Sequence, residues 1–508
     1  MNTTKRGFYN IFFGVFSQIL IMVFALVTPR LVIENYGSEV NGLLHSVAQI
    51  FAYFSLFEAG VGSATLQALY APVANHDIDK VSGILSATGR FYSRTGIVYA
   101  LGVTAVSFLY PVAVRTSLSY FFVVGIIFLG GIGGCINFIY QGKYTILMQA
   151  EGYSYVITSI NMICNIAQNV VKIILLLRGN NILTIQFLSL LISLLRAIIY
   201  HRFIKKHYRD VDLKATPDFA SISQKNAVFV HQISYLIFSS TDVLLLTFLT
   251  QDLKIVSVYT LYNAIVSAVY NLIQHFSNGF DFRLGQIYSV DKERYFKLFH
   301  VADIYHLVLI FSAMSALCCI ILPFMSLYTK GITDVNYINK WYPLLFVMVP
   351  ILDHGRKAAN STIAFAGHFD QTKKYAIGEA ALNLLISIIG VSFFGVPGAL
   401  IGTIVSLVYR TANMIWYVYK FLIPGNPWMT IKRWLFCFAV FGTVIIANSF
   451  IIPPADSFIH IVVLAIVLGV ICLLVFSVGM YLINPKERRE ILLLLQVAIK
   501  SIVKKRTP

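Results

Sequence analysis

The chain has 508 residues, of which 58% are hydrophobic and only 12% are charged. This balance leaves too little polar surface for a water-soluble globule. The formal net charge of +17 would suit a nucleic-acid partner, but the basic residues are distributed as in a membrane protein, so we expect no nucleic-acid partner.

Apolar stretches of the roughly 20 residues that a spanning helix needs recur along nearly the whole sequence. They predict an all-α integral membrane protein with about fourteen transmembrane helices. In chain order the spans are roughly 8–33, 43–70, 83–111, 119–149, 153–177, 182–204, 225–250, 256–282, 297–327, 340–366, 373–394, 397–423, 431–452 and 458–483. The first stretch is too long for a signal peptide and lacks a cleavage site, so we interpret it as a span.

Basic residues gather on alternate joints between the spans. They include Lys80, the segment 202–225, the segment 283–297 and the pair Lys432 and Arg433, whereas the joint at Asp252 carries few. By the positive-inside rule the basic joints are cytoplasmic, and so are both termini. Residues 485–508 are interpreted as a basic amphipathic tail on the inner leaflet. The six cysteines lie in apolar stretches without metal-ligand spacing, so no metal site is expected.

An internal repeat appears when the sequence is shifted against itself by roughly 214 residues. Gln49 then pairs with Asn263 and Lys80 with Arg294, and at nearly the same shift Pro111 pairs with Pro323. Because six helices separate the copies, the repeat is parallel. We therefore predict six-helix bundles at 1–210 and 211–424, two additional helices at 425–484, and the tail at 485–508.

Several short motifs resemble one family of membrane proteins. They are Thr28-Pro29-Arg30 with Tyr36-Gly37, the run 57–62 (FEAGVG), and Asn383 followed by small residues from Gly395 to Thr403. The chain is similar to the O-antigen and capsule repeat-unit flippases (Wzx-like polysaccharide transporters) of the multidrug/oligosaccharidyl-lipid/polysaccharide (MOP) exporter superfamily. The resemblance implies a MATE-like V of two bundles around a central cavity.

The same resemblance implies a transporter and not an enzyme. It would move a polyprenyl-pyrophosphate-linked oligosaccharide repeat unit to the outer leaflet of the bacterial cytoplasmic (inner) membrane by alternating access, for surface polysaccharide biosynthesis. Membrane lipids and polysaccharide polymerase machinery are the implied partners. No cofactor is implied, although Na⁺ or H⁺ could drive the movement.

Such a flippase must carry a charged pyrophosphate across hydrocarbon, so we searched the spans for basic residues. The run 353–357 (DHGRK) falls near the middle of a span and predicts a pyrophosphate site. The residues assigned to it are His354, Arg356, Lys357, Arg410 and Lys143. A structural pair between Asp353 and the following bases is the alternative, as is a bond from Arg410 to helix carbonyls.

Polar side chains at helical spacing predict one wet face on each of two repeat-related helices. The sugar-binding or cavity-lining residues are His45, Gln49 and Gln67 on one and Asn263, Asn271, Gln274 and Asn278 on the other. Polar contacts between packed helices are the alternative. Four acids within apolar helices are candidates for cation coupling, namely Glu58, Asp242, Asp353 and Glu379.

Rival functions leave different marks on a sequence. A nucleotide-driven pump would need a Walker motif, which is absent here. Polytopic sugar transferases carry acidic residues on sizeable outer loops, and every outer joint predicted here is short. A drug or cation antiporter of the same superfamily would favour an acidic cavity. A peptidoglycan lipid-precursor flippase is close in fold and charge and stays open as an alternative.

Overall fold

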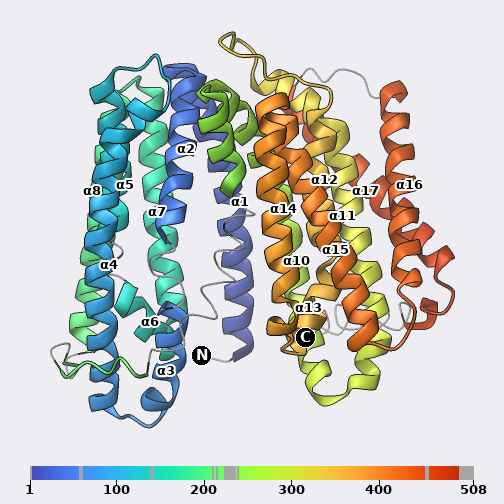
Figure 1. Ribbon diagram of the computed structural model, residues 1–508, viewed down its shortest axis with the longest axis horizontal. Helices are drawn as coiled ribbons and strands as arrows, with labels where there is room; N and C mark the ends of the chain where they lie inside the picture. Colours follow the sequence, from blue (N-terminus) through green and yellow to red (C-terminus); the bar gives the residue numbers. More distant parts are fainter. Residues whose placement is uncertain are drawn as a thin grey trace. The chain divides into compact units, whose positions relative to one another are not determined.

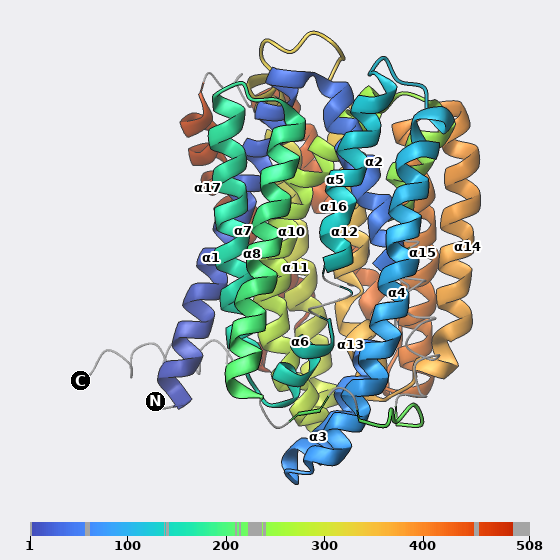
Figure 2. The same cartoon turned by 90° about the vertical axis from the view of Figure 1, so that its left-hand side faces the viewer.

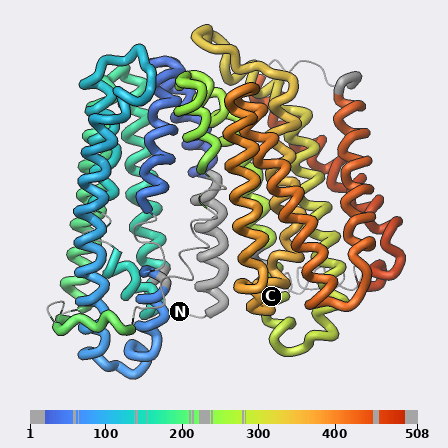
Figure 3. The backbone as a smooth tube through the Cα atoms, in the orientation of Figure 1, coloured from blue at the N-terminus to red at the C-terminus, as the bar shows by residue number. Residues whose placement is uncertain are grey.

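The computed structural model describes residues 3–55, 61–136, 138, 142–208, 211–212, 215–221, 236, 240–451 and 457–490. The described residues are helical apart from short joints, so the all-α membrane fold predicted from composition is confirmed (Figures 1 and 3). The chain forms two compact units, Met1–Leu261 (unit 1) and Tyr262–Pro508 (unit 2). The predicted domain limits at 210 and 424 stay predictions.

The long helices of unit 1 have roughly aligned axes (Figure 2). Helix α5 packs against both α4 and α8, and α7 packs against α8 and α1. The helices are α1 (Thr3–Tyr36), α2 (Ser38–Phe54), α3 (Val61–Ala74), α4 (Ile78–Ala113), α5 (Tyr120–Ile136), α6 (Gly142–Ala150), α7 (Ser154–Leu177), α8 (Ile182–His207), the π-helix η3 (Leu246–Thr250) and the start of α10 (Leu253–Val290).

Unit 2 contains the rest of α10 and seven further helices. Helix α11 lies at its centre and packs against α12, α13, α16 and α17, while α15 packs against α12, α13 and α14. The helices are α11 (Lys292–Tyr328), α12 (Tyr342–Gly355), α13 (Lys357–Phe365), α14 (Phe369–Phe394), α15 (Val396–Phe421), α16 (Trp428–Ile451) and α17 (Phe458–Ile483).

Within the described part of the chain, nine helices are long and apolar enough to cross a membrane, and two shorter apolar helices accompany them. The predicted span 340–366 is divided into two helices, α12 and α13, with Arg356 between them. The helix pattern agrees roughly with fourteen spans, although apolar length alone did not reveal this break.

The internal repeat is visible in how two long helices begin. The Asp77 carboxylate accepts from the Lys80 backbone N–H (3.1 Å) at the start of α4, and Asp291 accepts from the Arg294 N–H (2.9 Å) at the start of α11. These N-caps satisfy otherwise orphaned donors at equivalent positions of the repeat. The two helices have 36 and 37 residues, so the repeat extends from sequence to architecture.

Small residues bring α14 and α15 into backbone contact. A Cβ added to Gly398 would lie 1.9 Å from the Gly390 carbonyl oxygen, so only glycine fits there. Asn383 of α14 donates to the Thr403 hydroxyl of α15 at 2.9 Å. Close approach through small residues and interhelical polar bonds is typical of packing in membranes, where burial of apolar surface gives little drive. This packing fixes the face of α14 that carries Glu379.

Candidate functional site

The predicted basic cluster lies in unit 2, at the break between α12 and α13. Helix α12 ends at Gly355, Arg356 stands between the helices with φ −83° and ψ 3°, and α13 begins at Lys357. A Cβ on Gly355 would lie 2.4 Å from the Trp434 ring of α16. The glycine therefore permits close packing of the indole against the break, which turns the side chains of Arg356 and Lys357 toward α10 and α14.

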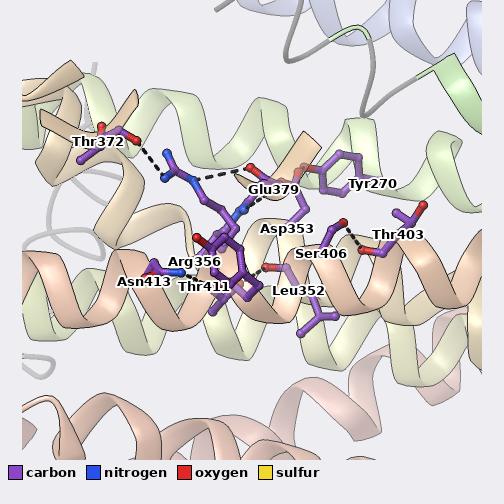
Figure 4. Close-up of polar contacts among 12 residues, drawn as sticks. Tyr270, Leu352, Asp353, Arg356, Thr372, Glu379, Thr403, Ser406, Thr411 and Asn413 are labelled. Carbon is purple, nitrogen blue, oxygen red and sulfur yellow. Dashed lines mark hydrogen bonds and ion pairs between the residues drawn. The ribbon is translucent and has the colours of Figure 1, made fainter. Parts of the chain in front are cut away.

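Arg356 binds two carboxylates from different helices (Figure 4). Its Nη2 lies 2.8 Å from Asp353 Oδ1 on α12, and its Nη1 lies 2.7 Å from Glu379 Oε1 on α14. The Arg356 side chain is only 10% exposed. Charge-assisted bonds from a guanidinium are among the strongest that a protein makes, so Arg356 joins α12 to α14.

Arg410 of α15 contacts the same Glu379 carboxylate as Arg356. Its Nε lies 3.5 Å from Glu379 Oε2, and its Nη1 donates to the Thr372 carbonyl at 3.3 Å. The two predicted alternatives, a bond to a helix carbonyl for Arg410 and a local ion pair for Asp353 with Arg356, are both seen. Glu379, a predicted cation-coupling acid, is shared by two arginines.

Lys357 extends the network toward α10. Its Nζ lies 3.1 Å from Gln274 Oε1 and 3.6 Å from Asp281 Oδ2. The Gln274 amide donates to the Tyr270 hydroxyl, which donates to Asp353. Gln274 was predicted to line a sugar cavity, and here it links the lysine to the arginine network. A continuous polar path thus runs through unit 2.

The polar path of unit 2 ends at Asp281 and two histidines, His306 and His354. His306 Nε2 of α11 lies 3.2 Å from Asp281 Oδ1, and the Ser361 hydroxyl donates to Asp281 Oδ2 at 3.3 Å. His354 Nε2 lies 3.0 Å from the Ser277 hydroxyl. The sequence singled out His354 but missed His306, whose only signal was an ionisable residue inside an apolar span.

The network is charge-balanced among the described residues, although the predicted basic cluster has an excess of bases when the run is taken alone. Alone, the run 353–357 carries two bases and one acid. The fold adds Arg410 and two more acids, so Arg356, Lys357 and Arg410 face Asp281, Asp353 and Glu379. Local sequence could not show this balance because Asp281 and Glu379 come from other helices.

The remaining predicted pyrophosphate residue, Lys143, lies in unit 1 at the second position of α6. At the repeat spacing of roughly 214 residues it corresponds to Lys357, the first residue of α13. Its ammonium lies 5.1 Å from the centre of the Tyr144 ring. Among the described residues no carboxylate lies within ion-pair distance of it, whereas Lys357 contacts Asp281.

Lys172 on α7 is a second cation in unit 1, and sequence reasoning missed it. His45 on α2, a predicted cavity residue, is half-buried. Lys172 forms no ion pair with a carboxylate within the described ranges. A lysine within an apolar helix is a functional candidate by default.

The other predicted residues are dispersed. Gln67, Asn263 and Asn271 are exposed and Gln49 is half-buried. The side chain of Asn278, and Glu58 altogether, lie outside the described residues. Asp242 is buried in unit 1 and accepts from the Tyr259 hydroxyl at 3.0 Å. The acids predicted for cation coupling therefore occupy more than one place, with Asp353 and Glu379 in the unit 2 network and Asp242 in unit 1.

No family model and no curated protein matches the sequence, but solved structures share its fold. An inward-facing multidrug resistance MATE family transporter of the MOP superfamily matches with a TM-score of 0.65 and 12% identity, over 78% of this chain and 95% of that one. The lipid II flippase MurJ, in an inward closed conformation, matches with a TM-score of 0.62 and 15% identity, over 93% and 99%. The MATE multidrug transporter DinF-BH matches with a TM-score of 0.55 and 12% identity, over 80% and 93%. At these identities the likeness establishes a shared fold.

Proposed function

We propose that this protein is a flippase that moves a polyprenyl-pyrophosphate-linked oligosaccharide repeat unit from the inner to the outer leaflet by alternating access, in the bacterial cytoplasmic membrane. The observation that carries the proposal is a set of cations inside the spans of a fold shared with a lipid II flippase. A pyrophosphate is costly to move through hydrocarbon unless cations receive it.

The two units offer these cations differently. Lys143 and Lys172 in unit 1 form no ion pair with a carboxylate of the described residues, and the proposal assigns them the first contact with the phosphate. Arg356 and Lys357 in unit 2 are held by acids. A pyrophosphate that reaches them must take the place of Asp353, Glu379 or Asp281, which couples substrate binding to rearrangement of the network.

The comparison also favours a lipid substrate over a drug. The MurJ structure covers 93% of this chain, whereas the MATE transporter covers 78%. A cationic drug would be attracted by excess acid within the spans, and none is present in the balanced network of unit 2. Polysaccharide polymerase machinery and a driving Na⁺ or H⁺ remain parts of the proposal.

The test reconstitutes the full chain in liposomes that contain one fluorescently tagged probe each. The probes are a polyprenyl-pyrophosphate-linked oligosaccharide, tagged lipid II and a cationic rhodamine dye. A membrane-impermeant quencher reports movement of the lipids between leaflets, and dye accumulation reports antiport. We expect movement of the oligosaccharide lipid. Faster movement of lipid II would favour the peptidoglycan alternative, and dye accumulation without lipid movement would refute the flippase.

Charge removal then tests the binding residues. Lys143→Gln combined with Lys172→Gln should slow lipid movement about tenfold, as the loss of ~1.4 kcal/mol of stabilisation would do. The matched control is Lys80→Gln, a lysine in the first turn of α4 with a side chain that is 71% exposed. Equal rates in the double variant and the control would remove these lysines from the site.

A further inference from the structure

Two fully buried histidines face each other where α11 packs against α12. The ring centres of His306 and His354 lie 5.2 Å apart, and both side chains are 0% exposed. Each ring uses Nε2, toward Asp281 and Ser277 respectively. The Nδ1 atoms of both rings are buried and have no hydrogen-bond partner among the residues that the structure describes. Such orphaned buried atoms need an explanation, since nearly all buried polar groups are satisfied.

The orphaned atoms distinguish the protonation states of the pair. A neutral His306 with its proton on Nε2 donates to the Asp281 carboxylate and leaves Nδ1 as an unused acceptor. A protonated His306 has two N–H donors, and only one of them finds an acceptor in this arrangement. The neutral form therefore fits this conformation, and the protonated form requires a rearrangement that brings an acceptor to Nδ1.

The charges around His306 also favour its neutral form in this conformation. His306 faces Asp281 of α10 and His354 of α12, with Tyr305 beside it on its own helix, and Lys357 of α13 contacts the same Asp281 carboxylate. The three acids and three bases of the network already balance. One further proton gives the network a net positive charge within the membrane-embedded unit, where an unbalanced charge is costly.

The fold itself does not require this pair. At the repeat spacing, Gln67 and Tyr92 of unit 1 correspond to Asp281 and His306. Tyr92 is buried and packs against Gly142 at the start of α6. The same helix arrangement is thus built in unit 1 with neutral side chains, so the acid and the imidazole in unit 2 serve something other than packing.

We propose that Asp281, His306 and His354 form a proton-binding site whose occupancy shifts unit 2 between two conformations. The inference deepens the proposed function, because it names H⁺ as the ion that drives the flippase. A proton bound at this site would favour the conformation in which both Nδ1 atoms gain partners, and its release would return the arrangement described above. Differential affinity for the proton is what links binding to movement.

The test uses the full chain in liposomes without any lipid-linked substrate. Asn263→Cys on α10 is exposed and reports conformation through its rate of reaction with a soluble maleimide. Because thiol reactivity itself rises with pH, each rate is divided by that of the same cysteine in detergent-unfolded protein. Between about pH 8 and about pH 5, the range in which histidine titrates, the corrected rate should change roughly tenfold.

Variants in this reporter background locate the proton. His306→Gln and Asp281→Asn should each abolish the pH response, while His275→Gln, an exposed histidine on α10, should keep it. Ser361→Ala removes only one hydrogen bond to Asp281 and must shift the midpoint even if the other variants fold poorly. A flat profile in the reporter protein, an unchanged profile in His306→Gln, or an unmoved midpoint in Ser361→Ala overturns the proposal.

This experiment stands apart from the flippase test. The labelling rate needs no substrate, so a pH response without lipid movement would sustain the proton site while the proposed function fails. Lipid movement with a flat labelling profile would support the proposed function and overturn the proton site.

Discussion

Replacing Arg356 with alanine should destabilise unit 2 by breaking the link between α12 and α14. Removing one partner of a buried ion pair typically costs ~3–5 kcal/mol. The cost here should lie near ~3 kcal/mol, the lower end of that range, because Glu379 keeps its contact with Arg410 and Asp353 is 29% exposed. For a domain of this size, ~3 kcal/mol corresponds to about 6–12 °C in apparent Tm.

Second variants separate this mechanism from a general loss of packing. Among the described residues Arg356 is the cation that pairs with Asp353, so adding Asp353→Asn to Arg356→Ala should restore most of the stability. Adding Glu379→Gln should restore less, because it removes the described carboxylate partner of Arg410. The assay is the thermal stability of the purified chain in detergent, with exposed Arg283→Ala of α10 as the matched control. Full stability of Arg356→Ala, or better rescue by Glu379→Gln, would refute the reasoning.

Three further predictions concern packing and topology. Gly355→Ala should lower the apparent Tm through overpacking worth ~1–3 kcal/mol, since its Cβ would meet Trp434 at 2.4 Å, and Trp434→Leu in the same chain should relieve the clash. Arg433→Ala should be more damaging, by ~3–5 kcal/mol, because this fully buried guanidinium pairs at 2.9 Å with carboxylates on α11 and after α17; a thermal melt like that of the parent would contradict it. Reporter fusions at Glu293 should read cytoplasmic and those at Asp252 external, and the opposite result would invert the membrane orientation.

The sequence predicted the long helices well because the demand for apolar length is strong. The 26 residues Phe458–Ile483 of α17 lie almost where the hydrophobic run placed them. The break between α12 and α13 was not visible in apolar length alone. An uninterrupted apolar stretch does not distinguish one bent span from two short helices. The pairing of Trp434 with Gly355 is a tertiary contact with no local signal.

Sequence predicted the residues of the candidate site that carry a local signal and missed those that depend on tertiary contacts. Basic residues at mid-span are conspicuous, so Arg356, Lys357 and Arg410 could be chosen from sequence. The pairing of Asp353 with Arg356 followed from their spacing. Asp281 and Glu379 could not be assigned to their cations, because which distant acid faces which base depends on helix rotation and packing. Lys172 was overlooked although it lies within an apolar run. His306 was overlooked because a lone histidine in a core span is more often a packing residue than a functional one.

The internal repeat allows the charges of the two units to be compared at equivalent positions. Lys143 and Lys357 stand at equivalent starts of α6 and α13, so both units carry a cation at the same structural position. In unit 2 that cation contacts Asp281, and the surrounding arginines contact Asp353 and Glu379. In unit 1 the equivalent of Asp281 is the neutral Gln67. Charge has therefore diverged on a retained backbone. Among the described residues Lys143 forms no ion pair with a carboxylate, so under the proposed function it is the cation that meets an anionic headgroup, whereas the balanced network of unit 2 is proposed to respond to added charge by rearranging.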